Sequence, residues 1–511
     1  MKPAAGLLLM LASLGAIAQD LPAPHNFDHI ILIVQENRTP DNLFHGLSGL
    51  VGSNGVAYDI QNYGLASDDP GVHIPLLPSG LGEGYDLSHN HPAFVAAFSA
   101  NQNDGSWQVP FRCGKTFALG AGCVAANQSP VDTYPQYKYV ENTAFVYKKK
   151  NYNLLDPYLD LATQYGWANF MFQTNQGPSY PAHLFLFGGT SAPSADDDAA
   201  KTFISENPSG GADSFNDVGC SAVDVNGQLF DVEAQLITPN GEEKGNRSPT
   251  CFDHDNMADL LDSNQITWRY YTPTTGFEGA NKAGSIWTAP NAFSSICTPE
   301  KDENGQYQCT GKDWSPGANG FIDLTPPDVF ADINGTGPSG CNLAAVSWVI
   351  PAGQYSDHAA INFAEGPSWV GDIVNAVGKS PCGYWQNTAI VITWDDWGGW
   401  YDHEVPPSAP DQYSDYAYGF RVPLIFVSAY TPNGYVSNTK YFDFGTILRF
   451  VEHNFGLTEG ALHFADAIAK GNLSQFYKFT RSPRKFKSIV TPLDASFFVE
   501  NAMAPEPPDD D

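Results

Sequence analysis

The chain has 511 residues, with 25 lysines and arginines against 56 aspartates and glutamates, which gives a formal net charge of −31 at pH 7. Because nucleic acids bind through clustered cations, this charge argues against nucleic acid as a partner. After the first residues, no stretch approaches the ~18 consecutive apolar residues of a membrane-spanning helix. We therefore expect a soluble chain without a transmembrane segment.

The first residues have the pattern of a secretory signal. Lys2 precedes an apolar run from Ala4 to Ile17, and small residues surround position 18. This run is too short to span a membrane and is typical of a signal peptide over residues 1–18. The pattern predicts a secreted or periplasmic protein.

Residues 19–500 are long enough for a single large domain. Long stretches rich in Gly, Pro, Ser, Asn and Asp predict insertions in it near residues 100–150, 190–250 and 273–340. The Pro- and Asp-rich end, residues 501–511, predicts a disordered tail. The sequence leaves the oligomeric state open.

Apolar runs and helical periodicity alternate along the chain. Strands are predicted to start at or near His29, Trp167, Ile266, Ala344, Thr388 and Arg421. Helices are predicted over residues 156–165, 255–264, 368–377 and 444–455. Strands that alternate with helices favour a mostly parallel sheet covered by helices on both faces, which is a three-layer α/β/α fold.

Eight cysteines in an exported chain without a C-x-x-C spacing indicate disulfides rather than a zinc site. Connectivity cannot be derived from sequence, but chain order suggests four pairs: Cys113–Cys123, Cys220–Cys251, Cys297–Cys309 and Cys341–Cys382. All eight lie between residues 37 and 395, in the part of the chain that is richest in Gly, Pro and Asn. We expect the disulfides to tie down the insertions.

Two residue pairs that contain carboxylates, which we call the acidic pairs, directly follow predicted strands. Glu36 and Asn37 follow the first, and Asp395 and Asp396 follow the strand that starts at Thr388. In an α/β sheet ligands bind beyond the carboxyl ends of strands, where three carboxylates together require a divalent cation. Adjacent acids after a strand also occur in solvated turns and helix caps. The three tryptophans and two glycines of "TWDDWGGWYDH" argue against an ordinary turn.

A serine follows the second predicted strand. In "NQGPSYPAHLF", Ser179 lies between Pro178 and Pro181, and these prolines predict a rigid loop at the same edge of the sheet. Serine becomes a good nucleophile when a base or metal lowers its pKa, and a metal between the acidic pairs would do so. By itself, a serine between prolines is more often a turn residue.

Five of the 12 histidines accompany these motifs. They are His89, His91, His183, His358 and His403. A lone histidine is more often structural, but phosphoryl transfer needs donors for nonbridging oxygens, and histidine provides them near neutral pH.

Several motifs, in order along the chain, resemble a secreted phosphoesterase family that groups bacterial phospholipases C with acid phosphatases of the A type, within the alkaline phosphatase-like superfamily. The motifs are "QENRTPDNLFHG", "GPSYPAHLFLFGGT", "WRYY", "SDHAAINFAEGPSWV", "ITWDDWGGWYDHEVPP" and "GFRVPLIFVS". The resemblance implies an alkaline phosphatase-like α/β/α core with long disulfide-stapled insertions.

The resemblance also implies residue roles. Ser179 matches the nucleophile that forms a covalent phospho-enzyme, with His89 and His358 as further catalytic residues. One divalent ion, which could be Ca, Mg, Mn or Zn, is implied to bind Glu36, Asn37, Ser179, Asp395 and Asp396. Phosphate is implied to contact Asn37, His89, His358 and His403.

In the middle of the chain, the acid phosphatase A branch has a consecutive histidine pair where this chain has "IWTAPNAFSSI" from Ile286. We therefore expect hydrolysis of diesters or phospholipid headgroups alongside monoesters, and we expect Trp394, Trp397 and Trp400 to line an apolar mouth. The alternative is a non-catalytic exported protein that binds a glycan or lipid and keeps a structural divalent cation.

Overall fold

The structure is a computed structural model of the chain. It describes residues 26–65, 72–82, 85–98, 105–112, 134–209, 218–224, 226–243, 245–273, 286–315, 318–360, 364–407 and 416–501. The predicted signal peptide, the predicted pair Cys113–Cys123 and nearly all of the predicted tail lie outside these residues. Within the described residues, no helix is long and apolar enough to cross a membrane.

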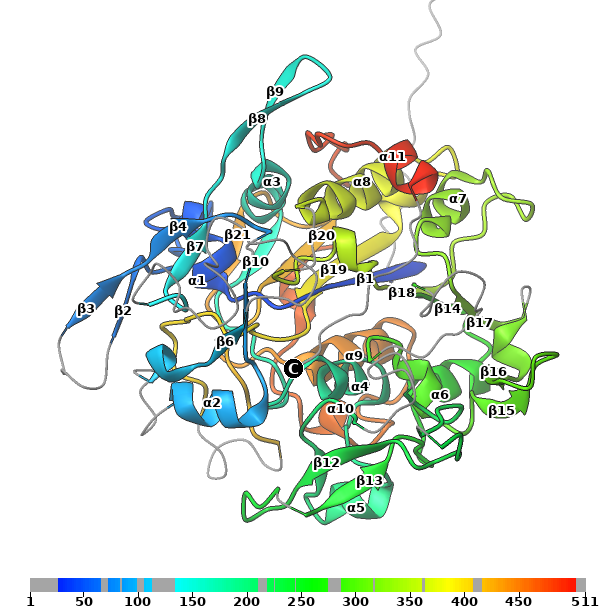
Figure 1. Ribbon diagram of the computed structural model, residues 1–511. Helices are drawn as coiled ribbons and strands as arrows, with labels where there is room; N and C mark the ends of the chain where they lie inside the picture. The colour runs from blue at the N-terminus through cyan, green and yellow to red at the C-terminus, as the bar shows by residue number, and fades with distance from the viewer. Residues whose placement is uncertain are drawn as a thin grey trace, which may run out of the picture.

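An eight-stranded sheet forms the centre of the fold (Figure 1). Its strands, in spatial order, are β17 (Gly320–Asp323), β14 (Trp268–Tyr271), β18 (Val346–Val349), β1 (His29–Gln35), β19 (Thr388–Trp394), β20 (Leu424–Ser428), β10 (Gly166–Ala168) and β21 (Tyr435–Ser437). The central strands β1 and β19 are buried almost throughout, because helices cover both faces of the sheet. All six predicted strands are confirmed.

The sheet is mostly parallel, as predicted, but it has features that the sequence did not predict. Strand β20 runs antiparallel to both of its neighbours, whereas β1, β14, β17, β18 and β19 pair in parallel. Strands β17 and β21 are too short for a periodicity to show. Because β17 completes one edge of the sheet, the segment 273–340 that was predicted as an insertion also contributes to the core.

Helices pack on both faces of the sheet (Figure 1). On one face lie α3 (Asp156–Gln164), α7 (Asp328–Asn334), α8 (Gly366–Lys379) and α11 (Ala495–Glu500). On the other lie α4 (Ser179–Gly188), α6 (Met257–Ser263), α9 (Phe444–Asn454) and α10 (Ala465–Ile468). All four predicted helices are present, and the architecture is the expected three-layer α/β/α arrangement.

The remaining elements lie outside the central sheet and its main helices. The helices are α1 (Pro40–Leu43), α2 (His91–Phe98) and α5 (Ala195–Ala199). The strands are β2 (Tyr63–Leu65), β3 (His73–Pro75), β4 (Leu77–Ser79), β5 (Asp86–Leu87), β6 (Phe111–Arg112), β7 (Lys138–Val140), β8 (Ala144–Tyr147), β9 (Lys150–Asn153), β11 (Phe203–Ile204), β12 (Glu233–Ile237), β13 (Arg247–Pro249), β15 (Thr298–Lys301) and β16 (Tyr307–Thr310).

The flanking prolines predicted that Ser179 lies in a loop. It is instead the first residue of helix α4. Pro178 is the N-cap, and Pro181 is the third residue of the helix. Proline is tolerated in the first turn because the N–H groups there have no intrahelical partner. Two prolines that read as a rigid loop are therefore compatible with the start of a helix.

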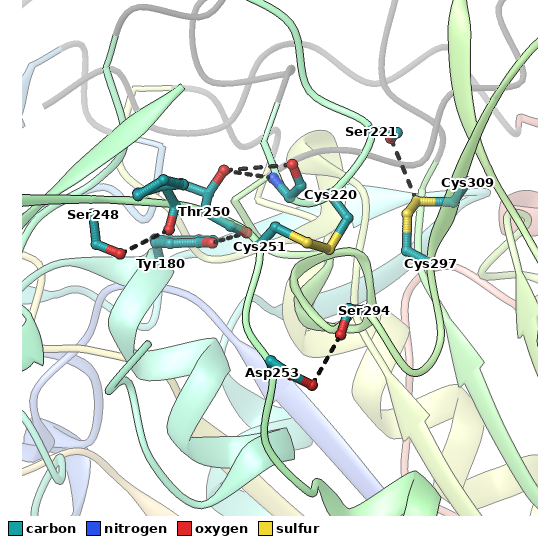
Figure 2. The surroundings of a disulfide bond; sticks show 12 residues. Tyr180, Cys220, Ser221, Ser248, Thr250, Cys251, Asp253, Ser294, Cys297 and Cys309 are labelled. Carbon is teal, nitrogen blue, oxygen red and sulfur yellow. Dashed lines mark hydrogen bonds between the residues drawn. A yellow bond between two sulfur atoms is a disulfide. The ribbon is translucent and has the colours of Figure 1, made fainter. Parts of the chain in front are cut away.

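Within the residues that the structure describes, three disulfides join the predicted pairs Cys220–Cys251, Cys297–Cys309 and Cys341–Cys382. Figure 2 shows that the first of these lies beside the start of α4. Next to Cys251, the carbonyl oxygen of Thr250 accepts a hydrogen bond from the Tyr180 hydroxyl (3.5 Å). A disulfide-linked segment therefore contacts the residue that follows Ser179.

Candidate active site

The two acidic pairs meet at one edge of the sheet. Strands β1 and β19 are parallel neighbours whose last residues, Gln35 and Trp394, are in register, so the residues that follow them emerge side by side. The backbone N–H of Asn37 donates to Asp395 Oδ1 (3.0 Å), and the N–H of Asp395 donates to the Gln35 carbonyl (2.9 Å). The side chains of Glu36, Asn37, Asp395 and Asp396 are fully buried.

The backbone around these pairs is tightly packed. Asn37 has a positive φ of 62°, which is uncommon outside glycine although asparagine adopts it more readily than most residues. Gly398, at φ 61°, packs against the carbonyl of Asn37 so closely that a Cβ atom would overlap with it. The N–H of Gly398 donates to Asp396 Oδ1 (2.7 Å). The "DDWGG" turn thus needs glycine here to fit against Asn37.

Helix α4 brings Ser179 to the carboxylates. Its Oγ lies 3.1 Å from Asp396 Oδ2 and 3.4 Å from Glu36 Oε2. As the first residue of a ten-residue helix, Ser179 also lies at the positive end of the helix dipole, where developing negative charge is favoured. The predicted nucleophile and the two acidic pairs therefore form one buried group.

His183 belongs to the same group, although its sequence motif predicted no specific role for it. Its Nε2 lies 3.1 Å from Glu36 Oε1 and 3.8 Å from Asp395 Oδ2. Burial lowers the pKa of His183 to about 4, although Asp395 acts in the opposite direction. The ring is therefore neutral near pH 7 and offers a lone pair. Because Ser179 and His183 are four residues apart, a helical reading of the segment would have placed them on one face.

We call Glu36, Ser179, His183, Asp395 and Asp396 the acidic cluster. Ligand atoms of Glu36, His183 and Asp395 lie within 4.8 Å of one another, close enough to bind one ion. Asp395 Oδ2 is buried and has no hydrogen-bond partner. An unpartnered buried carboxylate oxygen is costly, and a cation would satisfy it. The donor set therefore fits a divalent metal.

Two imidazoles border the acidic cluster through Asn37. Oriented so that both ends of its amide are satisfied, Asn37 accepts from His358 Nε2 (3.0 Å) and His89 Nε2 (3.3 Å) and donates to Asp396 (3.3 Å). The opposite nitrogen, Nδ1, faces a backbone carbonyl in each ring, at 2.8 Å in His89 and 2.6 Å in His358. Those carbonyls fix the rings so that both Nε2 atoms face the site.

Asp357, next to His358, anchors that loop from behind. Its Oδ2 accepts hydrogen bonds from the Tyr158 hydroxyl (2.7 Å) and Trp394 Nε1 (2.9 Å). Burial raises the pKa of Asp357 to about 6, although these hydrogen bonds and Arg38 lower it. Arg38 Nε donates to the Asp357 carbonyl (2.8 Å), so the loop that carries His358 is tied directly to the residue after Asn37.

His403, predicted to bind phosphate, lies in a different network. Its backbone N and its Nδ1 both donate to Asp41 Oδ2 (2.8 and 2.7 Å), and its Nε2 lies 3.4 Å from Asp59 Oδ1. Arg421 pairs with the neighbouring Asp402 through two hydrogen bonds (2.8 and 3.0 Å). Among the described contacts, none joins His403 to the acidic cluster, and its partners give it a structural setting.

The expectation of a tryptophan-lined mouth is wrong. Trp394, Trp397 and Trp400 are all fully buried. Trp397 packs against Phe420 in a small hydrophobic cluster, and Trp400 lies over the Arg38 guanidinium. These rings support the "DDWGG" turn from inside. The "IWTAPNAF" segment does approach the site, because the Trp287 ring lies 6.2 Å from that of His358.

A cleft opens beside the loop that precedes Ser179. It is lined in part by Asn175 and Gly177 from this loop, by Phe185 of α4, and by Phe203 and Tyr416. Gly177 is two residues from Ser179, so their Cα atoms are at most about 7.6 Å apart. The cleft therefore lies next to the segment that carries the predicted nucleophile, and its walls are largely apolar.

Comparison with known proteins agrees with this geometry. The profile of the Phosphoesterase family matches residues 27–458, which is most of the chain. The matched region contains the whole acidic cluster, Asn37 and both imidazoles. The chain belongs to the Phosphoesterase family.

Curated relatives are phospholipases C. The non-hemolytic phospholipase C of Pseudomonas aeruginosa is 26% identical over 43% of this chain and 35% of its own length. The hemolytic phospholipase C of that bacterium is 22% identical over 88% of this chain and 56% of its own length. Phospholipase C A of Mycobacterium tuberculosis is 24% identical over 90% of this chain and 78% of its own length. The chain thus spans about a third and about half of the two Pseudomonas proteins.

Solved structures match more distantly. A Vibrio parahaemolyticus protein in the alkaline phosphatase superfamily aligns over 60% of this chain and 61% of its own, with 12% identity and a TM-score of 0.29. The lipoteichoic acid synthase LtaP of Listeria monocytogenes aligns over 62% of this chain and 69% of its own, with 10% identity and a TM-score of 0.27. The α/β/α architecture described above rests on the strand order and helix layers of this chain.

Proposed function

We propose that this protein is a secreted, metal-dependent phosphoric ester hydrolase that uses Ser179 as its nucleophile. The observation that carries the proposal is the contact of Ser179 Oγ with both Glu36 and Asp396 inside a buried cluster. A serine hydroxyl placed against two carboxylates at a helix N-terminus is suited to activation rather than to a turn. Membership of the Phosphoesterase family supports the choice of a phosphate ester as substrate.

The metal would be held by Glu36, Asp395, Asp396 and His183, with Asn37 and Ser179 as further ligands. When bound, a divalent ion supplies positive charge that lowers the pKa of the serine hydroxyl and offsets charge on the phosphoryl oxygens. Carboxylates suit Ca, Mg and Mn, whereas imidazole suits Zn and similar ions. Among the four candidates, His183 therefore favours Zn.

Ser179 then attacks the phosphorus atom while its proton passes to Asp396, whose Oδ2 lies 3.1 Å away. A bond forms between Oγ and phosphorus, and the bond to the leaving alkoxide breaks. Water hydrolyses the resulting phosphoserine and regenerates the hydroxyl. Asn37, His89 and His358 hold the nonbridging oxygens, since the Nε2 atoms of both imidazoles already lie within 3.3 Å of the Asn37 side chain.

Phosphodiesters, including phospholipids with their headgroups, are the proposed substrates alongside monoesters. The three relatives described above are all named phospholipases C. A diester has a second ester arm, and the cleft lined by Phe185, Phe203 and Tyr416 next to the nucleophile segment offers apolar space for it. Three disulfides in the described residues support a secreted or periplasmic location. A purely binding protein would need no nucleophile at the cation site.

The test measures nitrophenol release by the purified protein from nitrophenyl phosphate, bis-nitrophenyl phosphate and nitrophenyl phosphorylcholine. We expect all three to be cleaved, chelator to abolish the activity, and one of Mn, Zn, Ca or Mg to restore it. Ser179→Ala should stop turnover while the folded state persists. Acid quenching of the wild type with a labelled substrate should trap phosphoserine at position 179. Near-wild-type turnover by Ser179→Ala would instead indicate a water nucleophile or Thr174.

A further inference from the structure

A two-stranded hairpin projects from the body of the protein (Figure 1). Strands β8 and β9 pair with each other and, in the part of the chain that the structure describes, with no other strand. Its base is held by Asn142 and Asn153, whose side-chain amides donate to the Asp156 carboxylate at the start of α3 (both 2.9 Å). An isolated hairpin contributes little to the stability of a fold, so its side chains are free to serve another purpose.

The tip of this hairpin is basic, and its residues are unfavourable for the backbone conformation of the turn. Lys148, Lys149 and Lys150 are consecutive and exposed. Lys148 and Lys149 have positive φ angles of 46° and 66°, a combination that hairpin turns usually give to asparagine or glycine. Local backbone preference therefore does not explain these lysines, and a local rule broken without a packing gain is expected at a functional surface.

A second basic segment contacts α3, the helix to which the base of the hairpin is also bound. Residues 478–487 contain five basic residues and no acidic ones, in a chain of net charge −31. They are Lys478, Arg481, Arg484, Lys485 and Lys487. Together with the three tip lysines, they make up eight of the 25 basic residues of the chain.

Contacts connect the two segments. Arg484 Nη1 donates to the carbonyl of Gln164, the last residue of α3, and the hairpin is anchored at the first residue of the same helix. Beyond the basic segment, Asp494 lies 3.7 Å from Lys148 Nζ, and both side chains are more than 60% exposed. An exposed pair of this kind is worth little, so it does not neutralise the tip.

Apolar side chains accompany the basic ones. Val146, beside the hairpin tip, is 69% exposed, and Val490, just after the basic segment, is 59% exposed. Phe145 and Tyr147 on the hairpin are only partly covered. Lysines next to exposed apolar residues suit the boundary between anionic headgroups and acyl chains, whereas a soluble polyanion would need the charges alone.

We propose that the β8–β9 hairpin and residues 478–490 form a docking face for lipid surfaces that carry anionic headgroups. The tip lysines and the exposed side chains of the basic segment contact the headgroups, and Val146 and Val490 enter the interfacial layer. The exposed side chains of that segment are Lys478, Arg481, Lys485 and Lys487. The inference goes beyond the proposed function, since docking requires neither the nucleophile nor a metal.

The experiment is sedimentation of the full chain with vesicles of phosphatidylcholine alone or mixed with phosphatidylglycerol. Lys148→Asn, Lys149→Asn and Lys150→Gln are combined, because asparagine accepts the positive φ angles of the turn. Each lysine near an anionic membrane raises binding about fivefold, so the triple variant should bind mixed vesicles about 100-fold more weakly. Lys301→Gln, Lys312→Gln and Lys470→Gln, combined, change the net charge equally elsewhere and should bind like the wild type.

Val146→Ser should also weaken binding to mixed vesicles, and Lys485→Gln with Lys487→Gln should do so without touching the hairpin. Cleavage of soluble nitrophenyl phosphorylcholine should be the same in all variants, which separates failed docking from a failed active site. The proposal would be overturned if the wild type, the tip variant and the Lys485→Gln, Lys487→Gln variant all sedimented equally with mixed vesicles. Retention on heparin that depends on the tip lysines, with no vesicle binding, would assign the face to a polyanion and also overturn it.

Discussion

Ser179 and His183 lie one turn apart on α4, and both contact the carboxylate of Glu36. One helix thus places the proposed nucleophile and a neutral imidazole against the same carboxylate. Because the carboxylates come from the ends of β1 and β19, the site depends on the packing of α4 against the central sheet. The disulfide-linked segment that contacts Tyr180 supports that packing from outside.

His183→Ala should lower metal affinity by at least 10–100-fold, because it removes one of the groups close enough to bind the ion. The measurement is the metal-dependent shift in melting temperature across a titration of Mn and Zn. His91→Ala is the control, since His91 lies near the motifs but pairs with Glu243. An unchanged shift in His183→Ala would mean that His183 orients Glu36 without binding metal.

Gly398→Ala should reduce turnover by orders of magnitude. A Cβ at this position would overlap with the Asn37 carbonyl and push the residue that joins both imidazoles out of place. Gly383→Ala is the matched control, because Gly383 has a similar positive φ of 78° but no atom within 4 Å of the added Cβ. Backbone strain should cost each variant about 1–2 kcal/mol of stability, and the overlap with Asn37 should add a further loss in Gly398→Ala. Equal turnover in the two would refute the packing argument.

Sequence patterns predicted the core well where the signal was long. Strands β1 and β19 are seven-residue apolar runs, and the acidic pairs that follow them had to meet once these strands were parallel neighbours. Periodicity could not detect β21, which has three residues. It also could not show that β20 runs antiparallel, because an apolar run carries no direction. His183 was noted near the serine motif but was given no specific role, because prolines suggested a loop where a helix begins.

The position of His403 could not be predicted from the sequence either, because it depends on tertiary contacts. The "DH" of "WYDHEVPP" follows the metal-site motif closely, but the turn at Gly398 and Gly399 redirects the chain. Asp402 and His403 then pair with Arg421 and Asp41, which come from distant parts of the sequence. Tertiary partners of this kind decide whether a histidine near a motif contacts the substrate or stabilises the fold.

Arg421→Met should destabilise the protein by about 3–5 kcal/mol, because it leaves buried carboxylates without their cation. Arg421 is fully buried, and its guanidinium donates twice to Asp402. The measurement is the denaturant midpoint at pH 7. Arg449→Met removes an exposed pair with Glu459 and should cost about 1 kcal/mol or less. A similar loss in both variants would show that burial does not determine the effect.

The stability contributed by His403 should disappear at alkaline pH. Burial and Arg421 lower the pKa of His403, but the carboxylates of Asp41 and Asp59 outweigh them and raise it to about 9. A group whose pKa is raised on folding stabilises the folded state fully below its unfolded pKa, about 6.5, and loses that contribution as pH rises through 9. The shift corresponds to about 3 kcal/mol.

Denaturant midpoints of the wild type and His403→Gln, measured at pH 6 and pH 9.5, test this. The wild type should be more stable than the variant at pH 6, and the gap should narrow by pH 9.5. Turnover of His403→Gln on a soluble diester at pH 6 should stay within a few-fold of wild type, because the contacts of His403 are with Asp41 and Asp59. A selective loss of turnover with unchanged stability would return His403 to the phosphate-binding role that its motif implies.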